Sequence, residues 1–378
     1  MLNTMHAIVC HAPLDYRLEE VSTPNAGPGE VVIKVDACGV CASDIKCYTG
    51  APLFWGDEHR KPYVETPVIA GHEFIGEVVQ LGDNAAEKHG LKLGDTAIAE
   101  QIVPCCDCRY CRTGKYWLCQ VHNIFGFQPV VNGGMAEFMK FPAQSLVHKV
   151  PSDMTKTDAA MIEPLACSIH AVQRGNIEFG DVVVVAGAGT LGLGMIGAAK
   201  LKNPGILIAI DLIPTRLEVA KKLGANITLN PIETDVVQEV LDLTEGYGCD
   251  VYIEATGHPM AVEQGLLMIR KAGTFVEFSV MREPVTVDWT IIGDTKELNI
   301  HGSHLGPYTY PLAIDYIYSG KIDVSQIFTH QFALVDFKIA FEMVQRGKDS
   351  IEGAVNTIGI FAAYMIALYG IAAEKVVY

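Results

Sequence analysis

Four cysteines lie close together in the first half of this chain. They follow the spacing C-x2-C-x2-C-x7-C and are Cys105, Cys108, Cys111 and Cys119. Thiolates are soft ligands, and four of them at such close loop spacing can close a tetrahedron around one zinc ion. The intervening residues are typical of a loop, so we predict a closed, structural zinc site. Cys106 falls out of this register, and we interpret it as a spare thiol.

A second group of possible zinc ligands is dispersed over three short segments. The ligand types are thiolates, an imidazole and carboxylates, which also build catalytic zinc sites. Taken singly, each segment fits a core or a surface position equally well, because buried cysteines are common in proteins. The candidates are Cys38, Cys41, His72, Glu73, Glu163 and Cys167.

A glycine fingerprint for a dinucleotide follows a run of valines. The strand-like residues 181–185 lead into G-A-G-T-L-G at 187–192, where a helix is predicted to begin. Gly187 allows a tight turn, Gly189 lets the backbone approach a diphosphate, and Gly192 lets the helix pack on the strand. Thr190 and Leu191, at the start of that helix, complete the predicted cofactor contacts.

An aspartate stands where the next predicted strand ends. In a dinucleotide site, the carboxylate of Asp211 would accept hydrogen bonds from the adenosine ribose and would repel a 2′-phosphate. Leu212 follows it, where a phosphate-binding site would carry an arginine, so we predict NAD rather than NADP. Arg216 lies one turn into the next helix, where it either covers the adenine or is an ordinary surface arginine.

These residues need two kinds of framework to position them. The first part of the chain consists of short β segments separated by glycine-containing turns, which predicts a barrel-like or sandwich domain. From about Thr157, strands and helices alternate, which predicts an open parallel sheet covered by helices. After Leu298 the alternation stops, so we expect the chain to return to the first domain. The predicted divisions are 1–158, 159–297 and 298–378.

The expected elements can be stated as residue ranges. In the first part, strands are expected at 6–10, 30–37, 74–81 and 96–103. Further along, strands are expected at 181–185, 205–211, 250–254 and 274–280. Helices are expected at 157–172, 190–201, 214–223, 259–271 and 310–318.

Composition excludes several classes of partner. The chain has 378 residues, with 28 basic and 44 acidic side chains, and a formal net charge of −16 that argues against a nucleic-acid partner. The first residues have no basic and apolar pattern of a secretory signal, so the eleven cysteines are expected to be reduced and the protein cytoplasmic. Residues 358–373 are apolar, but sixteen helical residues span only about 24 Å, less than the ~30 Å of a bilayer core. We expect this segment to pack against protein, with no membrane partner.

Taken together, the motifs resemble those of the zinc-containing medium-chain alcohol dehydrogenases, in the same order and over nearly the whole chain. The matching stretches are C-A-S-D from Cys41, G-H-E-F-I-G-E-V from Gly71, the four-cysteine segment, E-P-L-A-C from Glu163, and the glycine fingerprint with Asp211. The resemblance implies a β-rich GroES-like catalytic domain carrying both zinc sites and an α/β Rossmann domain with a doubly wound parallel sheet.

The resemblance also selects among the dispersed ligands. It implies that Cys41, rather than Cys38, and His72 bind the catalytic zinc. In the polyol branch, which is sorbitol-dehydrogenase-like, Glu73 and Glu163 fill the remaining protein positions. Other relatives use a cysteine four residues further on, where this chain has Cys167. We favour Glu163, because E-P-L is typical of the polyol branch, and Cys167 is the alternative.

Three further residues receive catalytic roles from the same resemblance. Ser43 is expected to take the proton of the substrate hydroxyl, and Asp44 to orient His72, although a helix-capping role for Asp44 would give the same sequence. Lys46 stands where many relatives have the histidine that ends the proton relay, so the proton leaves through water or through Lys46.

The implied reaction is the oxidation of a small polyol by hydride transfer to NAD+. The resemblance points to a four-carbon polyol such as erythritol or L-threitol, oxidised to erythrulose. The alternatives are another secondary alcohol (sorbitol, a butanediol, L-threonine or an aldose) and a non-catalytic dinucleotide-binding protein with structural zinc only. Relatives pair their Rossmann sheets edge to edge, so a homo-oligomer, a dimer or tetramer, is expected.

Overall fold

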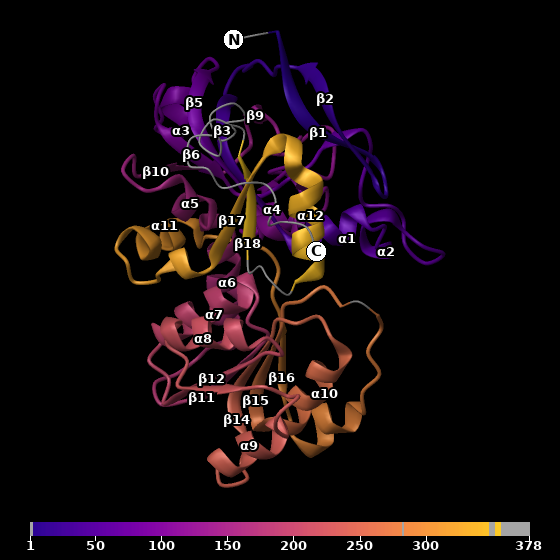
Figure 1. The fold of residues 1–378 in the computed structure, drawn as a ribbon, viewed down its shortest axis with the longest axis vertical. Coiled ribbons are helices and arrows are strands. Elements are labelled where there is room, and N and C mark those ends of the chain that lie inside the picture. The colour runs from indigo at the N-terminus through magenta and orange to yellow at the C-terminus, as the bar shows by residue number, and fades with distance from the viewer. Residues whose placement is uncertain (1–2, 282, 348–351, 357–378) are drawn as a thin grey trace, which may run out of the picture. The chain divides into compact units, whose positions relative to one another are not determined.

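The computed structural model describes residues 3–281, 283–347 and 352–356. The described residues divide into two compact units (Figure 1): the first contains those up to Ala160 and from Thr329 onward, and the second contains those in Met161–Phe328. Each unit has its own sheets and its own buried core, and each is described separately below.

The first unit is built on antiparallel sheets. A three-stranded sheet has the order β2-β1-β4, formed by Asp15–Ser22, Thr4–Ala12 and Val68–Ile69. Alternate residues of β1, namely Met5, Ala7 and Val9, are buried with Ile69 in one core cluster, as the twofold side-chain period of a strand requires. The predicted strand at 6–10 is therefore found, with an additional partner, β2, that was not predicted.

A seven-stranded sheet forms the rest of the first unit's framework. Its order is β10-β6-β5-β3-β18-β17, and β9 also pairs with β3. These strands are β3 (Val31–Val40), β5 (Phe74–Leu81), β6 (Thr96–Ala99), β9 (Phe138–Phe141), β10 (Val147–Val150), β17 (Phe328–Ala333) and β18 (Glu352–Asn356). A small two-stranded sheet pairs β7 (Ile102–Val103) with β8 (Asn123–Ile124).

Short helices connect these strands. They are α1 (Ala42–Tyr48), α2 (Pro52–Trp55), α3 (Ala85–His89), α4 (Arg109–Arg112), η1 (Tyr116–Leu118), α5 (Lys156–Ala160), η4 (Leu334–Asp336) and α12 (Phe337–Arg346). The predicted strand at 96–103 is two strands, β6 and β7, because Glu100 and Gln101 interrupt the ladder.

The second unit is a parallel six-stranded sheet with the order β13-β12-β11-β14-β15-β16. In chain order this is 3-2-1-4-5-6, which is the arrangement of a doubly wound dinucleotide-binding sheet. The strands are β11 (Val182–Ala186), β12 (Ile206–Ile210), β13 (Ile227–Leu229), β14 (Cys249–Glu254), β15 (Ile269–Glu277) and β16 (Asn299–Gly302). The predicted Rossmann fold is therefore confirmed.

Helices cover both faces of this sheet (Figure 1). On one face, a Cβ at Gly175 of α6 (Ile162–Gly175) would contact Val251 and Val276. On the opposite face, Gly265 of α10 (Pro259–Met268) lies against the ring of Tyr252. The remaining helices are α7 (Thr190–Lys200), α8 (Pro214–Leu223), α9 (Val236–Leu243), η2 (Ile291–Thr295), α11 (Tyr310–Tyr318) and η3 (Val324–Gln326).

The second unit extends further than the predicted boundary at residue 297. The strand β16 adds a parallel partner to β15, with Val276 opposite His301. The helix α11 then packs on α6, and Thr309 Oγ1 donates to the carbonyl of Ala166 at 2.8 Å. The return to the first unit thus follows Phe328 rather than Leu298, because a sixth strand and its helix still belong to the parallel sheet.

The predicted helix at 157–172 is divided in two. The helix α5 ends at Ala160 and α6 begins at Ile162, so Met161 separates a helix of the first unit from one of the second. The apolar residues 358–373 lie outside the described residues. Among the described helices, none is both long and apolar enough to reach across a bilayer.

Candidate active site and zinc centres

Three dispersed candidates come together in the first unit. Cys41 is the N-cap residue of α1, directly after β3, and His72 and Glu73 lie between β4 and β5. The ligand atoms of these three residues all lie within 4.8 Å of one another, and His72 and Glu73 are buried. A thiolate, an imidazole and a carboxylate at this separation are a donor set that suits a zinc ion.

Two glycines make room for this cluster. A Cβ at Gly39 would lie 2.2 Å from Oε2 of Glu73, so any other residue at this position collides with the carboxylate. Gly71 has a φ of +94° and turns the chain immediately before His72, and its missing Cβ would lie 2.6 Å from Sγ of Cys38. Cys38 itself is fully buried and does not belong to the cluster in the described residues.

Asp44 caps α1 and also lies close to His72, as both of its predicted roles require. Its Oδ2 accepts a 2.9 Å hydrogen bond from the backbone N–H of Cys41, which closes a capping box at the start of α1. Its Oδ1 lies 3.4 Å from Nδ1 of His72, and both side chains are buried. Ser43 places Oγ at 3.3 Å from Nε2 of the same imidazole. Lys46 lies half-buried in the last turn of α1.

An aromatic contact to His72 was not predicted. The ring of Phe127 lies 5.5 Å from the imidazole, centroid to centroid, and stacks at 5.3 Å on the ring of Phe54. Phe127 is far from His72 in the chain, and no motif marks it. This contact therefore could not be found from one sequence.

Glu163 and Cys167 lie in the second unit, one turn apart on α6. The thiol of Cys167 donates to Oε1 of Glu163 at 3.2 Å, and both side chains are buried. The two residues share one face of the helix, as their spacing predicts.

The four-cysteine segment forms a second compact cluster. The sulfurs of Cys105, Cys108, Cys111 and Cys119 all lie within 4.8 Å of one another. Cys105 Sγ is 4.0 Å from Cys111 Sγ, and Cys108 Sγ is 3.6 Å from Cys111 Sγ. A tetrahedron with Zn–S bonds of 2.3 Å has edges of about 3.8 Å, so the described sulfurs fit one zinc ion.

Backbone N–H groups point at these sulfurs. Cys119 Sγ accepts from the N–H of Cys105 at 3.3 Å, and Cys105 Sγ accepts from the N–H of Cys108 at 3.3 Å. The N–H of Gln120 donates to Cys108 Sγ at 3.4 Å. Hydrogen bonds from the backbone lower the pKa of the Cys108 thiol to about 6, which favours the thiolate form that a metal requires. Cys106 is exposed and lies outside the cluster.

A buried carboxylate connects this segment to the main sheet. Oε2 of Glu100 accepts a 2.7 Å hydrogen bond from the hydroxyl of Tyr116, which lies between two of the cysteines in the chain. Oε1 of the same carboxylate lies 3.1 Å from Nε2 of His148 on β10. Glu100 follows β6 directly and is 5% exposed, so it joins the cysteine segment to two strands from a buried position.

The glycine fingerprint of the second unit adopts the expected turn. Gly187 follows β11 with a φ of +98°, and Gly189 is the N-cap residue of α7. A Cβ at Gly192 would lie 1.8 Å from the carbonyl oxygen of Gly187, so the close approach of helix and turn requires glycine. Thr190 and Leu191 form the first turn of α7, and a helix N-terminus is where backbone N–H groups bind phosphate oxygens.

The carboxylate of Asp211 lies against this turn. Its Oδ2 accepts from the N–H of Ala188 at 2.7 Å, and its Oδ1 accepts from the N–H of Ile213 at 2.8 Å. Arg216, in α8, has Nη1 3.9 Å from the position of a Cβ on Gly189. The structure thus brings together all the residues predicted to contact a dinucleotide.

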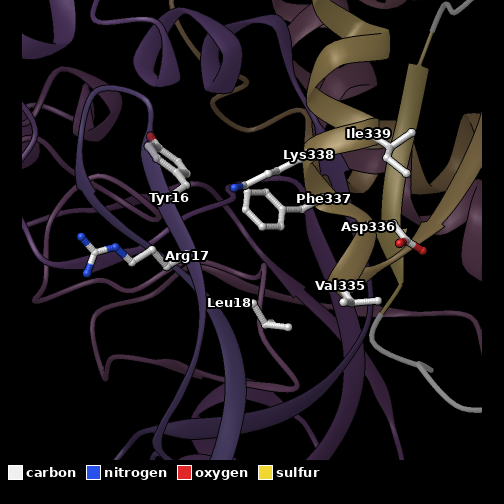
Figure 2. A pocket seen from close by; sticks show the side chains of 8 residues that line it. All are labelled: Tyr16, Arg17, Leu18, Val335, Asp336, Phe337, Lys338 and Ile339. Atoms are coloured by element: carbon white, nitrogen blue, oxygen red, sulfur yellow. The ribbon is translucent and has the colours of Figure 1, made fainter.

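A surface groove lies elsewhere in the first unit (Figure 2). It has a volume of about 460 Å³ and is lined by Tyr16, Arg17 and Leu18 of β2 and by residues 335–339 of η4 and α12. In Figure 2 the Phe337 and Lys338 side chains extend toward the β2 residues, whereas the Arg17 side chain extends away from them. It contains none of the predicted site residues, so we assign it no part in the chemistry.

Comparisons with known proteins agree with both units. The chain matches the family model of the alcohol dehydrogenase GroES-like domain over residues 27–152 and that of zinc-binding dehydrogenases over 190–319. It is 52% identical over 348 residues to the erythritol/L-threitol dehydrogenase of Mycolicibacterium smegmatis, covering 92% of this chain and 96% of that protein.

More distant relatives act on different substrates. The chain is 37% identical over 335 residues to the L-threonine 3-dehydrogenase of Pyrococcus horikoshii, covering 88% of this chain and 92% of that protein. It also resembles the crystal structure of 2R,3R-butanediol dehydrogenase from Bacillus subtilis, with a TM-score of 0.82 and 30% identity. That likeness covers 93% of this chain and 99% of the other.

Proposed function

This chain belongs to the family of zinc-binding alcohol dehydrogenases, and we propose that it oxidises a small polyol at a secondary hydroxyl by transferring hydride to NAD+. The observation that carries the proposal is the cluster of Cys41, His72 and Glu73 within 4.8 Å, in a chain whose second unit has a complete dinucleotide turn. A non-catalytic protein with structural zinc only would have no need of this second donor set.

We assign the ligands as follows. Cys41, His72 and Glu73 hold the catalytic zinc, and Glu163 is the remaining ligand that the family resemblance implies, with Cys167 as the alternative. The hydrogen bond from Cys167 to Glu163 fits a thiol that stays protonated beside a carboxylate. Cys105, Cys108, Cys111 and Cys119 hold a structural zinc.

The reaction moves a hydride and a proton in different directions. A zinc ion supplies Lewis acidity, which makes the hydroxyl of an alcohol easier to deprotonate. Ser43 takes up the hydroxyl proton as its own hydroxyl proton moves on toward solvent. NAD+, when bound, would supply the hydride acceptor, so the alcohol would give a ketone, NADH and one proton. Asp44 holds His72 in orientation through the 3.4 Å contact to Nδ1. Lys46, at the end of α1, or water passes the proton to solvent.

The choice of NAD rests on Asp211. Its carboxylate is fixed by the N–H groups of Ala188 and Ile213 at the end of β12, where the adenosine ribose of a dinucleotide lies in this fold. A 2′-phosphate at this position would meet a negative charge. Gly187, Gly189, Thr190, Leu191 and Gly192 bind the diphosphate, and Arg216 covers the adenine.

The proposed substrate is a four-carbon polyol such as erythritol or L-threitol, with erythrulose as the product. The 52% identity to a dehydrogenase of these polyols supports this choice over L-threonine, for which the identity is 37%. We further propose that the protein works in the cytoplasm as a homo-oligomer, with neither nucleic acid nor membrane as a partner.

A substrate comparison tests the proposal. Zinc-loaded enzyme is given NAD+ with erythritol, L-threitol, D-threitol, sorbitol, 2,3-butanediol or L-threonine, and NADH formation is followed. We expect the highest kcat/KM with a four-carbon polyol. Turnover of L-threonine or butanediol with no turnover of any four- to six-carbon polyol would overturn the polyol assignment.

A further inference from the structure

Three buried polar atoms that have no hydrogen-bond partner among the described residues lie at the ends of three neighbouring strands of the parallel sheet. They are Oε2 of Glu254 at the end of β14, Oε1 of Glu277 at the end of β15, and Oγ of Ser303 directly after β16. Burying a polar atom without a partner is unfavourable, and more so for a charged group. Such atoms at adjacent positions therefore point to an interaction among themselves.

The strand register places the two carboxyl groups side by side. In the parallel pairing of β14 and β15, Glu254 stands opposite Glu277, and parallel neighbours in register project to the same face. The backbone N–H of Ser303 donates to the carbonyl of Glu277 at 2.9 Å, which fixes the end of β15 against β16. Burial, together with the charge of Glu254, raises the pKa of Glu277 from 4.5 to about 7.

The other oxygen of Glu254 organises the loop after β14. Oε1 accepts from the N–H of Thr256 at 2.7 Å, from its hydroxyl, and from the N–H of Gly257 at 3.0 Å. This loop lies against the glycine turn, because a Cβ on Gly187 would be 2.7 Å from the carbonyl oxygen of Ala255. Glu254 thus organises the loop beside the dinucleotide turn with Oε1, while Oε2 accepts no hydrogen bond from the described residues and Glu277 stands opposite Glu254 on the next strand.

We propose that Glu254 and Glu277 share one proton, held on Glu277 and donated to Oε2 of Glu254, and that the protonated pair positions the loop at 255–257 against the dinucleotide turn. One negative charge is then buried instead of two, and the loop keeps all three of its hydrogen bonds. The pair consists of positioning residues, and the part concerning the cofactor rests on the function proposed above.

The elements packed around Glu277 carry other titratable or charged groups. Glu254 is the neighbour whose charge acts on Glu277. On α6, the Arg174 side chain donates to the carbonyl of Gly302, and the Lys296 ammonium binds carbonyls at the end of α10. Further groups on these elements include His170 on α6, His301 on β16, Glu263 on α10, Asp294 in η2, Cys249, Asp250 and Tyr252 on β14, and Arg270 and Lys271 on β15.

A shared proton makes stability depend on pH in a defined direction. The folded protein keeps the proton of Glu277 up to a pH of about 7, whereas the unfolded chain releases it near 4.5. The folded state therefore binds more protons between these values, and its stability falls as pH rises through this window. Glu277→Gln cannot ionise, so its stability lacks this fall.

The test compares thermal unfolding of zinc-loaded Glu277→Gln and wild type from pH 5 to pH 8.5. We expect the unfolding midpoint of the variant, relative to wild type, to rise by several degrees across this range. Glu254→Gln should also flatten the pH dependence of the unfolding midpoint. The variant that carries both substitutions should show no flatter pH dependence than either single variant. The matched control is Glu263→Gln, which removes an exposed glutamate of α10. The difference between its unfolding midpoint and that of wild type should not change with pH.

A midpoint difference that does not change with pH would overturn the shared proton. Fluorescence titration with NADH tests the positioning role: the ratio of wild-type to Glu277→Gln dissociation constants should increase severalfold from pH 6 to pH 8.5, and a constant ratio would overturn that role. If the wild type bound no NADH at any pH, the cofactor assignment itself would fail, while the unfolding comparison would still decide whether the proton is shared.

Discussion

Gly39 shows how a residue without a side chain decides the geometry of the proposed active site. The Glu73 carboxylate occupies the space in which a Cβ on Gly39 would lie, 2.2 Å from Oε2. The backbone N–H of Gly39 also donates to the carbonyl of Glu73 at 2.7 Å, so neither residue can move without the other. The position of the carboxylate is therefore set by β3.

We expect Gly39→Ala to displace the Glu73 carboxylate and to lower kcat/KM for polyol oxidation by roughly 10²-fold, because a shift of about 1 Å can cost that much. The matched control is Gly293→Ala, where an added Cβ meets no atom within 4 Å. Steady-state NADH formation measures both variants, and circular dichroism confirms folding. A folded Gly39→Ala enzyme with unchanged kcat/KM would contradict the role of Glu73.

Cofactor choice is a second property of single residues. We expect Asp211→Asn to raise the ratio of kcat/KM with NADP+ to that with NAD+ by about tenfold or more, since it removes one like-charge contact with the 2′-phosphate. The ratio is the appropriate measure, because the substitution also weakens a hydrogen bond from the backbone to residue 211, which would weaken the binding of both cofactors. An unchanged ratio would show that Asp211 does not select the cofactor.

Residues with a short-range signal were predictable, and residues without one were not. Cys41, His72, Glu73 and the glycine turn stand in motifs whose spacing reflects their chemistry. Phe127 contacts His72 only because two distant loops meet, and Glu277 acquires its environment from a neighbouring strand. Such contacts depend on tertiary structure and leave no local pattern.

At the scale of elements, the four-cysteine segment depends on one buried carboxylate for its attachment. We expect Tyr116→Phe to remove the hydrogen bond to Glu100 and to lower the free energy of unfolding by about 1.5–3 kcal/mol, as for a bond to a charged acceptor. The variant should also release one zinc to a chelator faster than wild type. The control is Tyr110→Phe, at an exposed position of α4. Equal stability and equal zinc release in both variants would contradict this attachment.

Element boundaries were predicted well where local chemistry marks them. The helix α8 begins at Pro214 and ends before Gly224, which has a φ of +116°. Both ends were predicted, because proline suits the first position of a helix and glycine readily adopts the left-handed conformation that ends one. The break at Met161 carries no such residue, and the predicted helix at 157–172 ran through it. The strand β16 was not predicted, because its place in the sheet depends on pairing with β15 and its own residues carry no clear strand pattern.

At the scale of the whole molecule, the chain combines a metal-binding unit with a dinucleotide-binding unit. The boundary between the two kinds of domain near residue 157 was predictable from the sequence, because antiparallel sheets and βαβ units differ in their hydrophobic patterns. The end of the second unit could not be predicted from the sequence, because the pattern of α11 does not show that α11 packs on α6. The proposed chemistry requires both units and both zinc sites in one protein.

The most direct test of this account measures zinc content and NADH formation together in wild type, Cys41→Ala and His72→Ala. We predict two zinc ions per wild-type chain, and about one zinc with no measurable NADH formation in each variant, because the Cys105–Cys119 cluster keeps its metal. Variants that still form NADH from a polyol at the wild-type rate would contradict the central claim that Cys41 and His72 hold the catalytic metal.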